Sequence, residues 1–149
     1  YFIPALNALT GRVFRLPTEA EWEFAARGGN DSDGFMFSGS NSIDDVAWYT
    51  GNSGYTTPTH AVGGKDPNEL GLFDMTGNVL EWVSDWYGTV YADRESGVTD
   101  PAGPATGYNR VIRGGSRTSN AGNCRVSYRG GNYPDLRRND IGFRLVLSL

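Results

Sequence analysis

The chain has 149 residues, of which 38% are apolar, 20% charged and 13% aromatic, a composition that suits one globular domain with a buried core. Seventeen Asp and Glu against thirteen Lys and Arg give a net charge of -4, so we expect no general attraction to nucleic acid. We expect no signal peptide and no membrane span in this sequence, and one cysteine with one histidine excludes an internal disulfide and a Cys/His zinc cluster.

The first predicted element is a short helix that ends near Gly11. Pro4 suits a first helical turn, and Leu6 and Leu9 lie three residues apart on one face. Gly11 is placed where a glycine commonly caps the carboxyl end of a helix.

A second helix is predicted over residues 18–27. Thr18 and Glu21 have the spacing of a capping box, in which each side chain accepts a hydrogen bond from the backbone of the other. Trp22 and the alanines that follow share one face, and Gly28 with the next glycine stops the helix.

The later part of the chain predicts short strands separated by turns rich in Gly and Pro. In the last of them, Ile141 and Phe143 belong to an alternating apolar set, so we expect Phe143 on the core side. Helices early and strands late predict a loop-rich α+β domain. The predicted strands are residues 79–86, 110–113, 123–129 and 141–147.

Long motifs carry a resemblance to a known family. They read RLPTEAEWEFAARGG at 15–29, PNELGLFDMTGNVLEWVSDWY at 67–87, and RVIRGGS at 110–116 with NDIGFRLV at 139–146. These motifs resemble the formylglycine-generating enzyme (sulfatase-modifying factor) family over nearly the whole chain and in the family's order. The resemblance implies a C-type-lectin-like fold with short antiparallel strands late. It also implies a single domain over 1–149 without the N-terminal strands of the complete family domain.

The family's catalytic pair does not carry over to this sequence. In the family, two cysteines hold copper and oxidise a substrate cysteine, and the matching positions here are Ser119 and Cys124. One thiol cannot form the two-thiolate site that a cuprous ion selects, so we expect no copper and no catalysis. We expect Cys124 to be a small buried hydrophobic residue and His60 to be an ordinary surface residue.

The segment DMTGNVLE at 74–81 matches a calcium loop of the resembled family. Carried over residue by residue, the resemblance implies Ca²⁺ ligands at Asp74, Gly77, Val79 and Glu81, with the two middle residues acting through backbone carbonyls. Hard oxygen ligands from such a turn suit Ca²⁺. The alternative is that Asn78 and Glu81 only close the turn by hydrogen bonds.

Residues 117–140 look diversified. The letters AGNCRV, PD and a final IGFRLVLS resemble the variable protein of a diversity-generating retroelement, which rewrites adenines in Asn codons. Mutation of both adenines of AAC reaches every residue type except Trp, Gln, Met, Lys and Glu, and none of these occurs over residues 110–149. This agreement is weak support, because the rest of the chain is also poor in Lys and Gln and chance accounts for much of the absence.

We expect the diversified positions to be exposed and to bind ligand. Their composition of Tyr, Asn, Gly, Ser and Arg is that of paratopes, and Tyr128, Tyr133 and Arg138 are the expected anchors. Whether Arg117 belongs to this surface or to the scaffold is open from the sequence. The predicted ligand-binding residues are Thr118, Ser119, Asn120, Tyr128, Gly130, Gly131, Asn132, Tyr133, Leu136, Arg138, Asn139 and Asp140.

The sequence therefore predicts a non-catalytic binding domain whose hypervariable surface recognises an unknown protein or other macromolecular ligand. Three alternatives stand beside it. One is an ordinary bacterial member of the family with a merely polar loop. Another is a copper- and oxygen-dependent formylglycine-generating (sulfatase-maturation) oxidoreductase, which Ser119 disfavours. The last is an accessory domain of a larger surface or signalling protein.

Overall fold

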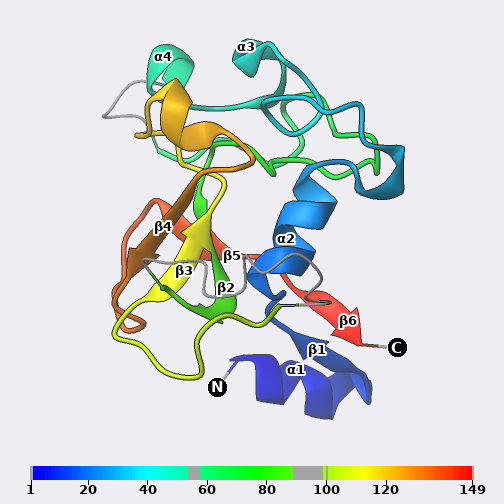
Figure 1. Ribbon diagram of the computed structural model, residues 1–149, viewed down its shortest axis with the longest axis vertical. Coiled ribbons are helices and arrows are strands. Elements are labelled where there is room, and N and C mark those ends of the chain that lie inside the picture. Colours follow the sequence, from blue (N-terminus) through cyan, green and yellow to red (C-terminus); the bar gives the residue numbers. More distant parts are fainter. Residues whose placement is uncertain (1, 54–57, 89–98, 100, 149) are drawn as a thin grey trace.

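The computed structural model describes residues 2–53, 58–88, 99 and 101–148 and has helices early and strands late (Figure 1). This arrangement confirms the predicted α+β class. In chain order the elements are α1 (Phe2–Thr10), β1 (Val13–Arg15), α2 (Glu19–Ala26), η1 (Gly29–Asp31), α3 (Ile43–Val46), α4 (Thr50–Ser53), β2 (Leu80–Trp86), β3 (Arg110–Arg113), η2 (Ala121–Cys124), β4 (Arg129–Asn132), β5 (Ile141–Phe143) and β6 (Val146–Ser148).

The strands form two sheets. One has four strands in the order β4-β3-β2-β5, and the other pairs β1 with β6 near the two ends of the chain (Figure 1). The pair β2-β5 is parallel, with Trp82 opposite Phe143, which corrects the expectation of antiparallel strands alone. None of the helices in the described ranges combines the length and apolar character that a membrane crossing requires.

Helix α2 begins with the predicted capping box. The Thr18 hydroxyl accepts from the Glu21 amide at 3.1 Å, and the Glu21 carboxylate accepts from the Thr18 amide at 2.8 Å. On the buried side of the helix, Trp22 packs with Val83 of β2 and Val111 of β3. The helix therefore covers one face of the four-stranded sheet and forms the core with it.

A buried ion network joins α2 to the sheet. The side chain of Arg113 is fully buried and donates to Glu19 at 2.6 Å and to Glu23 at 2.5 Å. Arg129 pairs with the second oxygen of Glu19. Because a buried guanidinium requires compensation of its charge, these contacts fix how α2 sits on β3 and β4.

The predicted strand over residues 123–129 is wrong over most of its length. Residues there first form the short 3-10 helix η2, and β4 begins only at Arg129. The side chain of Asn120 accepts a hydrogen bond from the Asn123 amide at 3.1 Å and so caps η2. This local bond competes with strand pairing, as Asn side chains often do.

The predicted final strand over residues 141–147 is two strands with different partners. β5 pairs with β2, and β6 pairs with β1. Arg144 lies between them and donates to Glu81 at 2.9 Å and to the Phe73 carbonyl at 3.0 Å. These tertiary contacts of Arg144 fall at the point where the chain leaves one sheet for the other.

Phe143 is not in the core, contrary to the prediction. It is 51% exposed, because it pairs with Trp82, and the core-facing residues Glu81 and Val83 alternate with Trp82 along β2. Its ring lies 5.8 Å from the ring of Phe2. The alternation in the sequence was real, but it did not show which of the two sheet faces α2 covers.

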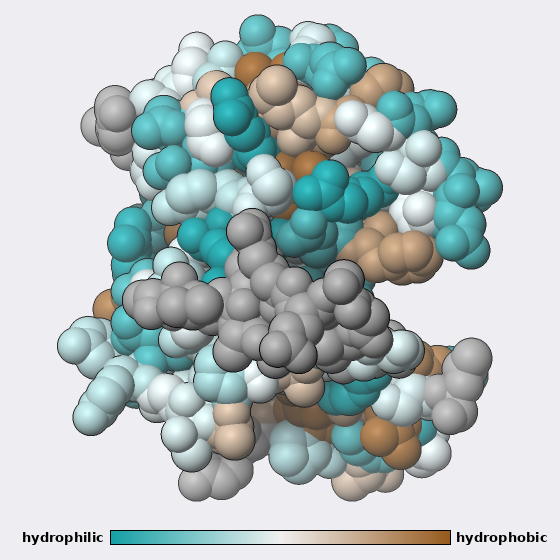
Figure 2. Space-filling view, viewed as in Figure 1, coloured by the Kyte–Doolittle hydropathy of each residue, from teal (hydrophilic) through white to brown (hydrophobic). Residues whose placement is uncertain are grey.

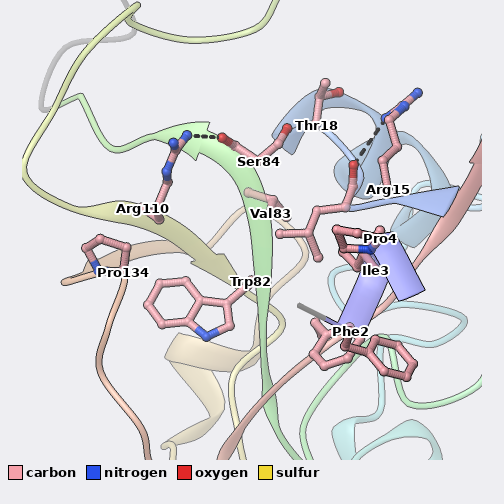
Figure 3. A pocket seen from close by; sticks show the side chains of 12 residues that line it. Phe2, Ile3, Pro4, Arg15, Thr18, Trp82, Val83, Ser84, Arg110 and Pro134 are labelled. Atoms are coloured by element: carbon pink, nitrogen blue, oxygen red, sulfur yellow. Dashed lines mark hydrogen bonds between the residues drawn. The ribbon is translucent and has the colours of Figure 1, made fainter. Parts of the chain in front are cut away.

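Phe143 lines an apolar groove of about 780 Å³ that the sequence did not reveal. Figure 3 shows Trp82 in this groove, with Pro134 on one side and Phe2 and Ile3 of α1 on the other. Helix α1 has no buried residue. Apolar side chains accordingly appear on the lower surface of the molecule, over α1 and β1 (Figure 2).

Candidate functional site

A polar cavity of about 400 Å³ gathers most of the residues predicted to bind ligand. We call it the variable cavity. Nine of the twelve predicted positions line it: Thr118, Ser119, Asn120, Tyr128, Gly130, Gly131, Asn132, Arg138 and Asp140. The fixed scaffold adds Leu80, Ile112, Ser116 and Asn123. Residues from η2, β4 and the segment before β5 thus meet beside Leu80 of β2 and Ile112 of β3, so the cavity spans the four-stranded sheet.

Asp140 organises the variable cavity. It is 2% exposed, and its carboxylate accepts two hydrogen bonds from Arg138, at 2.8 and 2.7 Å. The hydroxyls of Thr118 and Ser116 donate to it at 2.9 and 3.4 Å. The expectation that every predicted ligand residue is exposed is therefore wrong at this position.

The contacts of Asp140 keep its carboxylate ionised. Burial alone would raise the pKa of Asp140, but the hydrogen bonds from Arg138 and Thr118 outweigh burial and hold the pKa below its ordinary value. Arg138, whose side chain is 47% exposed, extends from this pair toward solvent. The cavity therefore contains a fixed ion pair with one buried and one accessible member.

Backbone contacts anchor the loop that precedes η2. The Ser119 amide donates to the Ser116 carbonyl at 2.9 Å, and the Ser119 carbonyl accepts from the Thr50 amide at 3.0 Å. Arg117 is 4% exposed, and its amide donates to the Asn78 carbonyl at 2.9 Å. Arg117 thus belongs to the scaffold, which answers the question that the sequence left open.

Two adjacent glycines of β4 differ in the space available for a side chain. A Cβ on Gly131 would lie 2.6 Å from Cγ of Tyr87, far inside normal contact. A Cβ on Gly130 would lie 3.3 Å from Cγ1 of Ile112, which is tight but close to ordinary packing. The structure therefore leaves position 131 little freedom to vary, although the sequence predicts variation at both.

Three predicted ligand residues lie outside the cavity lining. Tyr133 is 64% exposed and begins a turn in which its carbonyl accepts from the Leu136 amide at 3.0 Å. Leu136 is half-buried and Asn139 is exposed. A ligand larger than the cavity could meet these side chains on the loop that runs from β4 to β5.

The residues at the two positions that match the family's catalytic cysteine pair do not fit a copper site. Cys124 is fully buried against Phe37 and Val46, and burial raises the pKa of its thiol to about 12. The Ser119 hydroxyl accepts from the Ser116 amide at 3.0 Å. One protonated, buried thiol and a hydrogen-bonded hydroxyl do not supply the two thiolates that cuprous copper requires.

The predicted calcium loop is a strained turn whose acidic residues already have partners. Asp74 and Asn78 have a positive φ, which is unusual for residues other than glycine, and Gly77 between them is also left-handed, at a point where a Cβ would overlap the Trp48 carbonyl oxygen. Asp74 accepts from the Gly63 amide at 2.8 Å. Glu81 accepts from Trp22 Nε1 at 2.7 Å and pairs with Arg144 at 2.9 Å. A calcium ion would share the Glu81 carboxylate with Arg144, and Ca²⁺ binding by Asp74, Gly77, Val79 and Glu81 stays a prediction.

His60 is not the ordinary surface residue that the sequence suggested. It is half-buried, and its ring stacks on the ring of Trp48 at 3.9 Å. Its Nε2 lies 2.9 Å from the Ser53 hydroxyl, and its amide donates to the Asn78 side chain at 3.0 Å. His60 therefore packs as part of the scaffold, and its isolated position in the sequence gave no signal of this.

Comparison with known proteins agrees with the motifs. The model of the family described as "Sulfatase-modifying factor enzyme 1-like domain" matches residues 5–149. A formylglycine-generating enzyme of Streptomyces coelicolor is 39% identical over 145 residues, which cover 87% of this chain and 45% of that protein. This chain spans about half the length of the curated relatives it matches.

Two solved structures have the same fold. Treponema denticola variable protein 1 superposes with a TM-score of 0.78 at 44% sequence identity, covering 90% of this chain and 47% of that chain. PvdO from Pseudomonas aeruginosa superposes with a TM-score of 0.83 at 31% identity, covering 99% and 57%. The predicted resemblance to a variable protein is thus confirmed, and the chain belongs to the sulfatase-modifying factor enzyme 1-like domain family.

Proposed function

We propose that this chain is a non-catalytic ligand-binding domain whose variable cavity and adjoining loop recognise a protein or other macromolecule. One observation carries the proposal. Nine positions chosen from the sequence pattern alone line a single cavity, together with only four other residues. A cavity lined by adaptable polar side chains on a fixed scaffold suits recognition.

The similarity to a variable protein supports this function. At 44% identity, Treponema denticola variable protein 1 shares the fold over 90% of this chain. Diversification by a retroelement is part of the proposal. It accounts for a run of Asn, Tyr, Ser, Gly and Arg that borders a cavity instead of filling a core.

The second candidate is the oxidoreductase activity of the formylglycine-generating enzymes that this chain resembles. The same fold and 39% identity favour it. Against it stand Ser119 in place of one cysteine and the buried, protonated thiol of Cys124. We therefore rank binding above catalysis.

A display library tests the proposed function. The cavity positions other than Gly131 would be randomised in one library, and the exposed residues 30–33 in a control library of equal size. Both would be selected against the same panel of purified proteins. We expect saturable binders from the cavity library and none from the control. Equal yields from the two libraries would contradict a specialised binding face.

The rim residue Tyr133 should contribute to binding but not to folding. In a selected binder, Tyr133→Ala should lower affinity at least about tenfold, because tyrosines are frequent interface anchors. The free energy of unfolding, measured by urea titration, should stay within about 0.5 kcal/mol of wild type, because the side chain is exposed. The control is Val111→Ala in the core, which should cost about 2 kcal/mol. If Tyr133→Ala destabilised the fold as much, the residue would be a packing residue.

A further inference from the structure

The variable cavity contains one positive and one negative side chain, and they are paired. Among its lining residues only Arg138 and Asp140 are charged, and the other polar lining residues carry hydroxyls or amides. The Arg138 guanidinium binds Asp140 through two parallel hydrogen bonds at 2.8 and 2.7 Å. The cavity lining is therefore electrically neutral only while Asp140 is present.

The two members of the pair differ in exposure. Asp140 is 2% exposed and is also held by Thr118 at 2.9 Å, so it faces the interior. The side chain of Arg138 is 47% exposed, so it is the member of the pair that solvent can reach. An arriving carboxylate or phosphate would have to compete with Asp140 for the guanidinium and would meet its negative charge behind it.

We propose that Asp140 is the specificity-determining residue that sets the charge class of the ligand in the variable cavity. With Asp140, the cavity accepts uncharged groups that carry hydroxyls or amides. With a neutral residue at position 140, the released Arg138 accepts anions such as phosphate or carboxylate. This inference rests on the proposed binding function and adds the chemistry of the ligand to it.

The physical reason lies in how arginine binds anions. A guanidinium presents a planar fork of donors that matches carboxylate or phosphate oxygens, and Asp140 occupies this fork. Replacement by the isosteric asparagine keeps an oxygen for the Thr118 hydroxyl but removes the competing charge. One substitution at the floor of the cavity therefore changes the ligand class without changing the scaffold.

Titration with inorganic phosphate tests the inference without a natural ligand. Phosphate would be added to ¹⁵N-labelled wild type, Asp140→Asn and Asp135→Asn, and the amide shifts of residues 116–120 and 130–132 would be followed. Asp135→Asn is the matched control, because it makes the same charge change at an exposed position of the same loop. We expect Asp140→Asn to bind phosphate at least about tenfold more tightly than wild type or the control.

Two further variants make the result decisive. Adding Arg138→Ala to Asp140→Asn should abolish the gained phosphate binding. Arg138→Ala alone leaves Asp140 as the one cavity charge, so this variant should bind methylguanidinium in preference to phosphate, and it serves if Asp140→Asn fails to fold. Equal phosphate affinity in wild type and Asp140→Asn, or phosphate binding that survives the loss of Arg138, would overturn the inference.

The result of the phosphate titration can be distinguished from the result of the display library that tests the proposed function. If the cavity library gives binders and phosphate affinity does not depend on position 140, the role of Asp140 is wrong and the binding function stands. If phosphate binding follows the prediction and the library gives no binders, the chemistry of the pair is right and the macromolecular function is wrong.

Discussion

Cys124 is the residue on which the oxidase chemistry of the relatives would depend in this chain, because it is the only thiol. Burial raises its pKa to about 12, so the reactive thiolate is essentially absent at neutral pH. We expect no oxidation of a cysteine-bearing sulfatase peptide in the presence of copper and oxygen. The formylglycine-generating enzyme of Streptomyces coelicolor is the positive control. Turnover above the free-copper background would reinstate the enzymatic alternative.

The ionised Glu21 carboxylate at the start of α2 makes the stability of the fold depend on pH. A two-bond ion pair with Arg15, at 2.7 and 2.6 Å, and the cap at Thr18 lower the pKa of Glu21 from 4.5 to about 2. A lowered carboxyl pKa stabilises the fold above the unfolded value of 4.5, and this contribution disappears as the pH falls to about 2. Because both side chains are more than 40% exposed, the effect is modest.

Urea titrations of Glu21→Gln check this sign. The variant keeps an oxygen for the cap and loses the charge. Its midpoint should lie below that of wild type at pH 7, and the two curves should converge near pH 2. Asp33→Asn, an exposed carboxylate, should match wild type throughout. A difference at pH 7 that persists unchanged at pH 2 would show that packing, and not charge, is the cause.

At the scale of elements, β4 gives a sharp contrast between neighbouring residues. Gly131→Ala should destabilise the protein by about 1 to 3 kcal/mol, because its new methyl group would overlap Tyr87. Gly130→Ala should stay within about 1 kcal/mol, because Ile112 needs to move only slightly. Urea midpoints of the two single variants measure this. Equal midpoints would mean that Tyr87 shifts freely and that both positions can vary.

Local signals in the sequence predicted the elements that local contacts stabilise. The capping box at Thr18 and the left-handed cap at Gly11 are present as expected, because each depends on residues within a few positions. The strand assigned to residues 123–129 failed because the cap at Asn120 is equally local but was not recognised. The prediction that Phe143 lies on the core face was wrong because α2, which decides the core face, lies more than a hundred residues away in the chain.

In the candidate site, too, the sequence predicted what depends on nearby residues and missed what depends on distant ones. The resemblance to a variable protein, supported by the composition of residues 117–140, identified most of the residues that line the variable cavity. It could not distinguish Asp140 from its neighbours, because burial of Asp140 depends on Thr118 and Ser116, more than twenty positions earlier. Nor could it show that Tyr87 restricts Gly131.

At the scale of the whole molecule, calcium should raise thermal stability if the loop at 74–81 binds it. A ligand that binds only the native state stabilises by mass action, so a chelator should lower the Tm. Asp74→Asn should remove the difference between the curves with and without chelator. It is the suitable variant because asparagine tolerates the positive φ of 56° at that position.

Glu81→Ala is unsuitable as the calcium test, because it also removes the acceptor of Trp22 and the partner of Arg144. Asp33→Asn, an exposed carboxylate elsewhere in the chain, serves as the matched control and should keep the wild-type response to chelator. Identical melting curves of wild type with and without chelator would reject the calcium site.

β5 and β6, which follow residues 117–140 in the chain, complete the two sheets. β5 adds to β2 and β6 pairs with β1, so a nascent chain that has reached residue 140 still lacks one strand of each sheet. Translation runs from the amino end, so residues 117–140 leave the ribosome before β5 and β6, which complete the sheets. A substitution at any of residues 117–140 is therefore synthesised before the two sheets that support it are complete, so it cannot prevent the earlier elements from forming but can act only on the docking of β5 and β6.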